Sequence, residues 1–134
     1  MHEFIIGTNR KEELIDISAK ISEIVLKSGI KDGTLTAFVP HTTAGITINE
    51  GADPDVKKDI LNALSRIVPD KENYAHAEGN SPAHIKASIL GSSVNIIMKD
   101  NNLALGTWQK VFFSEFDGPR NRKVWVALSE NHAR

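Results

Sequence analysis

The chain has 134 residues, of which 40% are hydrophobic and 25% charged, as in one globular domain and unlike a disordered, collagenous or coiled-coil protein. Its 16 basic and 17 acidic side chains leave a net charge of −1, without the basic excess that attracts nucleic acids and anionic membranes. Cysteine is absent, which excludes disulfides and thiolate metal sites. We expect a single domain over residues 1–134 in the cytoplasm, because no signal peptide or stretch of ~20 apolar residues is present.

The N-terminal part of the sequence predicts a strand followed by a helix. Residues 3–8 have the composition of a short edge strand. The helix is expected to begin with Asp16 or Ser18 as its cap and to end at Gly29, a residue that readily closes helices. Its buried face follows the helical period through Ile17, Ile21, Ile24 and Val25.

Two alternating runs, TLTAFVPH (residues 34–41) and GITINE (residues 45–50), predict strands. In the first run Leu35, Ala37, Val39 and His41 share one face, and in the second Ile46, Ile48 and Glu50 do so. Because His41 and Glu50 continue apolar faces, we expect both side chains to point toward the core or an interface. Polar groups in such positions require hydrogen-bonding partners.

Two further helices are expected in the middle of the chain. Asp53 caps the first, with Pro54 at its first position and Pro69 after its end. A polar loop over residues 70–80 follows and leads to a short helix, with Ser81 as the cap, Pro82 at the first position and Gly91 at the end. The buried face of the longer helix is predicted to comprise Val56, Ile60, Leu61 and Leu64 and to extend to Val68. His76 then lies in the loop and His84 in the first turn of the short helix.

The C-terminal part predicts strands over about 92–98, 103–116 and 123–129, with Asn101 and Asn102 in the first turn. Helices and strands do not alternate regularly, so a doubly wound parallel fold is not expected. The fold class predicted is α+β, a single compact domain with a mostly antiparallel sheet and helices packed on one side.

Three histidines are the main candidates for chemistry: His41 at a strand end, His76 in a loop and His84 at a helix start. Three imidazoles with an open fourth position form a recurrent catalytic zinc site. However, HExxH is absent and the spacing of these residues matches no defined zinc motif. The histidines therefore fit either a metal site or structural and ligand-contacting positions.

The start of the short helix allows two kinds of ligand. A helix N-terminus disfavours a positive imidazolium, so His84 is expected to be neutral and able to bind a metal. The same helix end presents N–H groups that bind a phosphate or carboxylate. The residue types leave metal binding and anion binding equally open.

Two other residues are candidates for catalysis. Glu50 is a candidate acid or base, although it also fits a buried carboxylate held by backbone groups or by Thr42 and Thr43. Arg120 and Arg122 follow an Asp-Gly-Pro turn, where a guanidinium could bind phosphate in a bidentate manner or simply be solvated. The P-loop, GxGxxG and GxSxG motifs are absent, which excludes several common enzyme classes.

The segments VPHTTAGITINE, AHAEGNSPAHIKASILG and LALGTWQKVFFSEFDGPR occur in this order and are followed by NRKV. Together they resemble the YjbQ-type family, formerly an uncharacterised protein family and now often labelled secondary thiamine-phosphate synthase. The resemblance extends over about residues 4–128. It implies a compact α+β subunit that assembles as a homotrimer, with its histidine motifs near one another in an active site.

Carried over residue by residue, the resemblance implies catalytic roles for Glu50, His41 and Arg120. It implies substrate contacts from Thr42, Thr43, Asn80, Gln109 and Arg120, with Trp108 beside Gln109. The metal ligands would be His41, His76 and His84. The divalent metal would be zinc at these histidines or magnesium brought with pyrophosphate.

Three functions are compatible with these residues. The family reaction joins hydroxymethylpyrimidine diphosphate to thiazole phosphate and releases pyrophosphate, with Arg120 and the helix end at residues 81–84 stabilising the leaving group. A second possibility is a metal-dependent hydrolase with Glu50 as its base. The third is a non-enzymatic binder of a small anionic metabolite.

Overall fold

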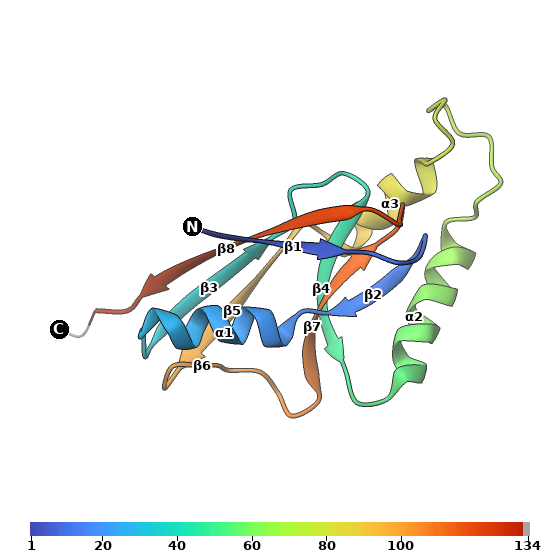
Figure 1. Cartoon of the computed structure of the whole chain (residues 1–134). Helices are drawn as coiled ribbons and strands as arrows, with labels where there is room; N and C mark the ends of the chain where they lie inside the picture. Colours follow the sequence, from blue (N-terminus) through green and yellow to red (C-terminus); the bar gives the residue numbers. More distant parts are fainter. Residues whose placement is uncertain (133–134) are drawn as a thin grey trace.

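A computed structural model describes residues 1–132 of the chain. Within these residues, eight strands form two antiparallel sheets, and three helices pack around them (Figure 1). The helices are α1 (Ser18–Ser28), α2 (Pro54–Ile67) and α3 (Ser81–Leu90). The five-stranded sheet has the order β1 (His2–Gly7), β8 (Asn121–Glu130), β3 (Gly33–Phe38), β5 (Ser93–Lys99) and β6 (Asn102–Leu103). The three-stranded sheet has the order β2 (Glu13–Asp16), β7 (Gln109–Glu115) and β4 (Ala44–Glu50).

The predicted α+β class is confirmed, but the expected strand over residues 103–116 is wrong. The chain ends β6 at Leu103, crosses from one sheet to the other and begins β7 at Gln109. The crossing contains a turn in which the Gln109 N–H donates to the Gly106 carbonyl over 3.0 Å. The sequence pattern predicts one continuous strand, because it carries no information about which strand each part pairs with.

The first strand and the end of the first helix agree with the prediction, whereas the N-terminal cap of the helix does not. Among the described strands, β1 pairs only with β8 and is therefore an edge strand. Gly29 ends α1 in the left-handed conformation, with φ of 71°. At the start of α1 the backbone cap is Ile17, while the carboxylate of Asp16 accepts a hydrogen bond from the Ser18 N–H.

The turn between β5 and β6 lies one residue earlier than predicted. Its residues with positive φ are Asp100 and Asn101, whereas Asn102 already belongs to β6. The Asn101 amide donates hydrogen bonds to the carbonyls of Val25 and Ile30. These bonds select the register of the turn, because they tie it to the C-terminal end of α1.

The main core lies between α1 and the inner faces of the two sheets. Its fully buried members include Ile21 of α1, Leu35 of β3, Phe113 of β7 and Val126 of β8. Burying apolar side chains of this size stabilises the fold by roughly 1.5–3 kcal/mol each. The β3–β4 connection, which carries His41, is thus attached to a well-packed strand.

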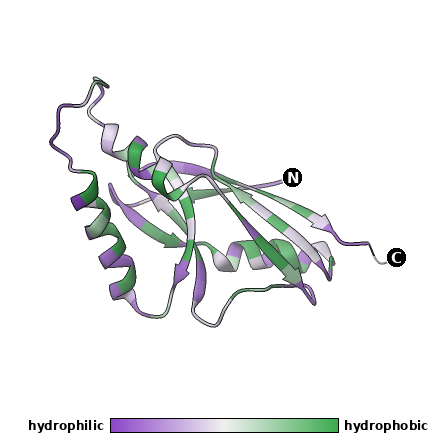
Figure 2. Cartoon of the chain, turned by 180° about the vertical axis from the view of Figure 1, so that it is seen from behind, coloured by the Kyte–Doolittle hydropathy of each residue, from purple (hydrophilic) through white to green (hydrophobic). Residues whose placement is uncertain are grey.

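Helices α2 and α3 pack against each other around a smaller apolar cluster. Leu64 of α2 meets Ala83 and Ala87 of α3 and Phe116, and all four are buried. Of the predicted α2 face, Leu64 and Val68 are buried; Ile60 and Leu61 are half-buried against the cluster. Figure 2 shows hydrophobic and hydrophilic residues alternating in bands along α2. The second cluster thus fixes α3 beside the three-stranded sheet.

The N-terminal cap of α3 is Asn80, whereas the sequence pattern predicts Ser81. The Asn80 carbonyl accepts from the N–H groups of Ala83 and His84, at 3.0 and 3.3 Å. Its side chain does not cap the helix but donates to Asp117. Ser81 is buried inside the first turn.

No helix within the described residues is long and apolar enough to cross a membrane.

Candidate functional site

His41 lies in the connection between β3 and β4, where its ring is fixed by the neighbouring strand. Its Nε2 atom accepts a hydrogen bond from the Lys123 backbone N–H of β8 over 2.9 Å. The ring proton must therefore be on Nδ1. Burial and the nearby Arg122 charge lower the pKa of His41 below its ordinary value. The imidazole is thus neutral near pH 7 and presents an N–H donor on its other side.

A buried ion pair holds the backbone next to His41. The Arg122 Nε donates to the carboxylate of Glu115 over 2.9 Å, and these residues are 3% and 0% exposed. The same guanidinium donates to the Thr43 hydroxyl over 2.9 Å. Arg122 was a candidate phosphate ligand in the sequence, but it is an internal support for the loop that carries His41 and Thr42.

Arg120 takes the exposed position on the Asp-Gly-Pro turn. Its backbone N–H donates to the Thr8 hydroxyl over 2.8 Å, which attaches the turn to the end of β1. Its Nε donates to the Asp117 carbonyl, and one terminal nitrogen lies 3.1 Å from the Asp117 carboxylate. The side chain is 51% exposed, so its guanidinium retains donors that face solvent.

The ionised state of Glu115 depends on this network. Burial alone would raise its pKa, but hydrogen bonds from Arg122, the Asp117 N–H and the Thr8 hydroxyl outweigh burial and lower it. Thr8 and Glu115 were not among the site residues predicted from the sequence. The available signal was a carboxylate within the apolar run FFSEF, because a charge among core residues requires a buried partner.

A surface groove joins these residues to α3. Two hollows of about 510 and 540 Å³ share His41, Thr42 and Ser92 in their walls. His84 borders the first hollow, and Arg120 borders the second. The groove therefore combines neutral or basic donors, a hydroxyl group and a guanidinium, which are groups that bind phosphate oxygens.

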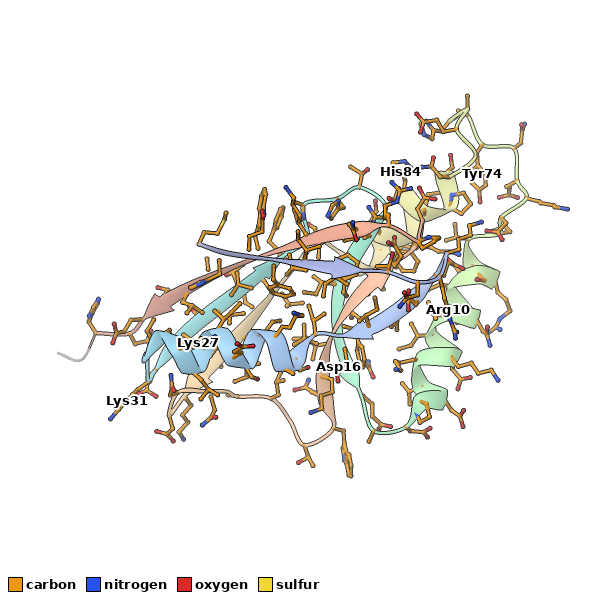
Figure 3. The ribbon with its side chains drawn as sticks, in the orientation of Figure 1. Arg10, Asp16, Lys27, Lys31, Tyr74 and His84 are labelled. Atoms are coloured by element: carbon orange, nitrogen blue, oxygen red, sulfur yellow. The ribbon has the colours of Figure 1, made fainter. Side chains whose placement is uncertain are left out.

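His84 also contacts His76, which lies in the loop before α3. Their ring centroids are 5.2 Å apart with the rings nearly perpendicular. They border a hollow of about 340 Å³ together with Tyr74 and Ile85. Figure 3 shows Tyr74 and His84 close to each other at α3 and the preceding loop. Two of the three predicted histidines are thus in contact.

The three histidines do not form a zinc site within one copy of the described chain. No group of three or more His, Asp or Glu side chains among residues 1–132 is arranged to hold a metal ion. His41 could bind zinc through Nδ1 only as the other tautomer, which would turn its Nε2 into a donor facing the Lys123 N–H. The tautomer and the position of His41 both fit a hydrogen-bonding role better than a metal-binding role.

Glu50 and Gln109 lie at the opposite end of β4. They face each other across the β4–β7 pair, whereas Ala44, at the other end, faces Glu115. At about 3.4 Å per residue, Glu50 is roughly 20 Å along the strand from Ala44. Glu50 is half-buried, and no side-chain donor from the described residues contacts its carboxylate. One copy therefore does not bring these two residues to the histidine groove (Figure 1).

Trp108 is adjacent to Gln109 and points outward from a well-fixed backbone. Its indole is 62% exposed, although its carbonyl accepts a hydrogen bond from the Gly51 N–H over 2.9 Å. The Gln109 side-chain oxygen accepts from the Gly106 N–H over 2.8 Å. Trp108 is therefore not part of the core of a single copy of the described chain.

Sequence comparison relates this chain to proteins named without a function. The model of the UPF0047 protein YjbQ-like family matches residues 2–131. The chain belongs to the YjbQ/UPF0047 family. It is 53% identical to the UPF0047 protein MJ1081 of Methanocaldococcus jannaschii, over 96% of this chain and 93% of the relative. The UPF0047 protein YugU of Bacillus subtilis is 45% identical, over 92% and 94% of the two chains.

Solved structures of the YjbQ/UPF0047 family have the same fold. An uncharacterised family member from Clostridium acetobutylicum, at 51% identity, matches with a TM-score of 0.94 over 96% of this chain and all of that one. A protein of unknown function from Sulfolobus solfataricus matches with a TM-score of 0.93 at 34% identity, over 97% and 96% of the two chains. The fold and family are therefore shown, whereas the activity has to be inferred from the site.

Proposed function

We propose that the groove between His41, His84 and Arg120 binds the phosphate or diphosphate group of a small metabolite. The observation that carries this proposal is the half-exposed Arg120 guanidinium at one side of a groove that also contains His41 and Thr42. A guanidinium binds phosphate through two parallel hydrogen bonds. Neutral His41 adds its Nδ1–H, because its Nε2 is occupied by the Lys123 N–H.

The reaction we propose for this groove is the thiamine-phosphate synthase reaction expected from the family resemblance. The ring nitrogen of thiazole phosphate would attack the methylene carbon of hydroxymethylpyrimidine diphosphate. The bond from that carbon to the diphosphate oxygen breaks, and pyrophosphate leaves with the electron pair. The chemistry requires stabilisation of the leaving charge. Arg120 and the Nδ1–H of His41 would provide it, with magnesium entering as part of the diphosphate substrate.

A histidine-liganded hydrolase is less well supported by the geometry. It needs three converging imidazoles, whereas the Nε2 atom of His41 accepts a hydrogen bond from the Lys123 N–H and residues 1–132 contain no group of three side chains arranged to hold a metal ion. A non-enzymatic binder of a phosphorylated metabolite would use the same groove as the synthase. These two functions differ in turnover and not in the site.

The test is calorimetry with pyrophosphate, paired with an assay of pyrophosphate release from the two proposed substrates and magnesium. Arg120→Ala should weaken pyrophosphate binding by roughly tenfold or more, because a hydrogen bond to a charged group contributes about 1.5–3 kcal/mol. The matched control is Arg66→Ala, which removes an exposed arginine from the last turn of α2. This control should bind as the wild type does.

Each result of these measurements selects one function. Release of pyrophosphate that is lost in Arg120→Ala supports the synthase. Tight binding without turnover supports the metabolite binder instead. If the wild type does not bind pyrophosphate, or if both arginine variants bind equally, the groove is not a phosphate site. Stoichiometric zinc in protein purified without chelators would favour the hydrolase.

A further inference from the structure

Two contacts to one residue, Asp117, hold the Arg120 side chain. The Arg120 Nε donates to the Asp117 carbonyl over 2.8 Å, and a terminal nitrogen donates to the Asp117 carboxylate over 3.1 Å. A guanidinium is a planar fork with its N–H donors in fixed directions. Two contacts on one side of this fork set its orientation and leave the other donors for a ligand. Asp117 therefore decides which edge of the Arg120 guanidinium faces the groove.

Asp117 is itself attached to the buried network below the groove. Its backbone N–H donates to the carboxylate of Glu115 over 3.0 Å, and Glu115 is fully buried. The N–H of Phe116, the residue before it, donates to the Thr43 carbonyl over 3.2 Å. The Asp117 side chain is only 22% exposed. It is thus a fixed attachment point for Arg120 and unlike a freely moving surface carboxylate.

Asn80 connects the same carboxylate to helix α3. Its Nδ2 atom donates over 3.0 Å to Asp117 Oδ2, the oxygen that also accepts from Arg120. Its backbone carbonyl accepts from the N–H groups of Ala83 and His84 at the start of α3. An asparagine suits this place because its amide nitrogen donates to a carboxylate, whereas an aspartate would repel it. The side of the groove that carries Arg120 is thereby joined to the side that carries His84.

The side-chain amide of Asn80 is not presented to the groove. Of residues 1–132, those that line the two hollows of the groove do not include Asn80. It lines a separate hollow of about 270 Å³ together with Asp117. Its Nδ2 is bound to Asp117, and its Oδ1 is fully buried without a hydrogen-bond partner among the described residues. The family resemblance implies a substrate contact from Asn80, but these observations favour an indirect role.

We propose that Asp117 and Asn80 are positioning residues, which orient Arg120 for phosphate binding and do not contact the ligand. Asp117 holds the guanidinium, and Asn80 holds the carboxylate of Asp117. The ligand then meets an arginine whose orientation is already set, and it does not have to immobilise a flexible side chain. This inference rests on the proposed phosphate groove and deepens it by stating what sets the geometry of the site.

A double-mutant cycle separates positioning by Asn80 from direct contact. Calorimetry with pyrophosphate compares Asn80→Ala in the wild-type chain with the same change in Asp117→Ala. In the wild-type chain it should weaken binding by about twofold to tenfold, because the ligand must then help to immobilise Arg120. In Asp117→Ala it should have no further effect, since the carboxylate that Asn80 holds is already absent. The same loss in both backgrounds would mean that Asn80 binds the ligand directly, and would overturn the proposal.

The role of Asp117 is tested by two substitutions that both remove its charge. Asp117→Asn keeps a side-chain oxygen that can accept from Arg120 and Asn80, whereas Asp117→Ala does not. Asp117→Asn should therefore bind pyrophosphate about twofold to tenfold more tightly than Asp117→Ala. Equal binding by the two variants would overturn the proposal. The matched control for the amide is Asn95→Ala, an exposed position on β5, which should bind as the wild type does.

Side-chain NMR of Arg120 gives a readout that needs no ligand. Its Nε–H donates to the Asp117 carbonyl, so this proton should exchange slowly with water. Exchange should become faster in Asn80→Ala and Asp117→Ala, where the second contact that holds the guanidinium is loosened or lost. The Nε–H of Arg66, an exposed residue of α2, should exchange equally fast in all variants and serves as the reference.

The two measurements distinguish failure of the inference from failure of the proposed function. If the wild type binds pyrophosphate but Arg120 exchange is the same in both variants, the positioning role is rejected and the phosphate groove stands. If Arg120 exchange responds as expected but the wild type does not bind pyrophosphate, the phosphate groove is rejected. Asp117 and Asn80 then orient Arg120 for another purpose, and the proposal as stated is overturned.

Discussion

At the scale of single residues, the hydrogen bond between His41 and the Lys123 backbone makes a direct prediction about titration. The folded chain disfavours protonation of His41 through burial and the Arg122 charge, so its pKa lies below the ordinary 6.5. Nitrogen NMR should find the proton on Nδ1 at pH 7 and a midpoint below that of an unstructured peptide. A proton on Nε2, or a midpoint at or above 6.5, would contradict the described geometry.

The second residue-scale prediction compares two arginines of the same segment. Arg122→Met leaves Glu115 as a buried unpaired charge, which should lower the free energy of unfolding by about 3–5 kcal/mol. Arg120→Met breaks only the half-exposed pair with Asp117, which should cost less than about 1 kcal/mol. Urea unfolding at pH 7 measures both, and equal losses would show that the buried network does not support the fold as described.

Arg120 and Arg122 also show how much of the site could be predicted from the sequence. The sequence marked both Arg120 and Arg122 as phosphate candidates, since each follows the Asp-Gly-Pro turn. Which of them faces solvent depends on Thr43 and Glu115, which are distant in sequence and adjacent in space. The positions of His76 and His84 followed from local turn and helix signals. The separation of Glu50 from His41 could not follow, because it depends on the length and pairing of β4.

At the scale of elements, the contact between β4 and the end of α3 depends on a missing side chain. A Cβ atom on Gly45 would lie 2.6 Å from the Gly91 carbonyl oxygen and 3.4 Å from that of Ala87. Gly45→Ala should therefore destabilise the protein by about 1–3 kcal/mol through overpacking. Gly7→Ala is the control, because its new methyl group would meet only the Asn121 oxygen at 3.7 Å. If the melting temperature falls by the same amount in both variants, the close approach of Gly45 to the Gly91 carbonyl is contradicted.

The elements also show which signals are local. The ends of the helices were predicted well at Gly29, Asp53 and Gly91, because their start and stop residues act within one turn. Residues 103–116 were predicted as one strand and are divided between two sheets. The division depends on β5 offering an edge to β6 while β2 and β4 enclose β7. Propensity within a short window contains no such information.

At the scale of the whole molecule, the lowered pKa of Glu115 links stability to pH. The folded state holds the carboxylate ionised, whereas an unfolded glutamate binds a proton near 4.5. The stabilisation is therefore complete above about pH 4.5 and is lost as the pH falls through the lower folded value. His41 acts in the same direction at higher pH. Its lowered pKa makes the unfolded chain bind a proton first, so stability begins to fall below about pH 6.5.

Glu115→Gln separates the contribution of Glu115 to the pH dependence of stability from that of His41. The variant should be less stable than the wild type at pH 7, because Arg122 loses its buried counter-charge. It should also lack the steep loss of stability below pH 4.5, because no carboxylate remains at that position to be protonated. Ile21→Ala is the control: truncating a fully buried core residue costs about 2–5 kcal/mol but retains Glu115. Urea unfolding across pH should give Ile21→Ala a curve parallel to the wild type and Glu115→Gln a flatter acid limb. An acid limb as steep in Glu115→Gln as in the wild type would mean that other carboxylates control acid unfolding.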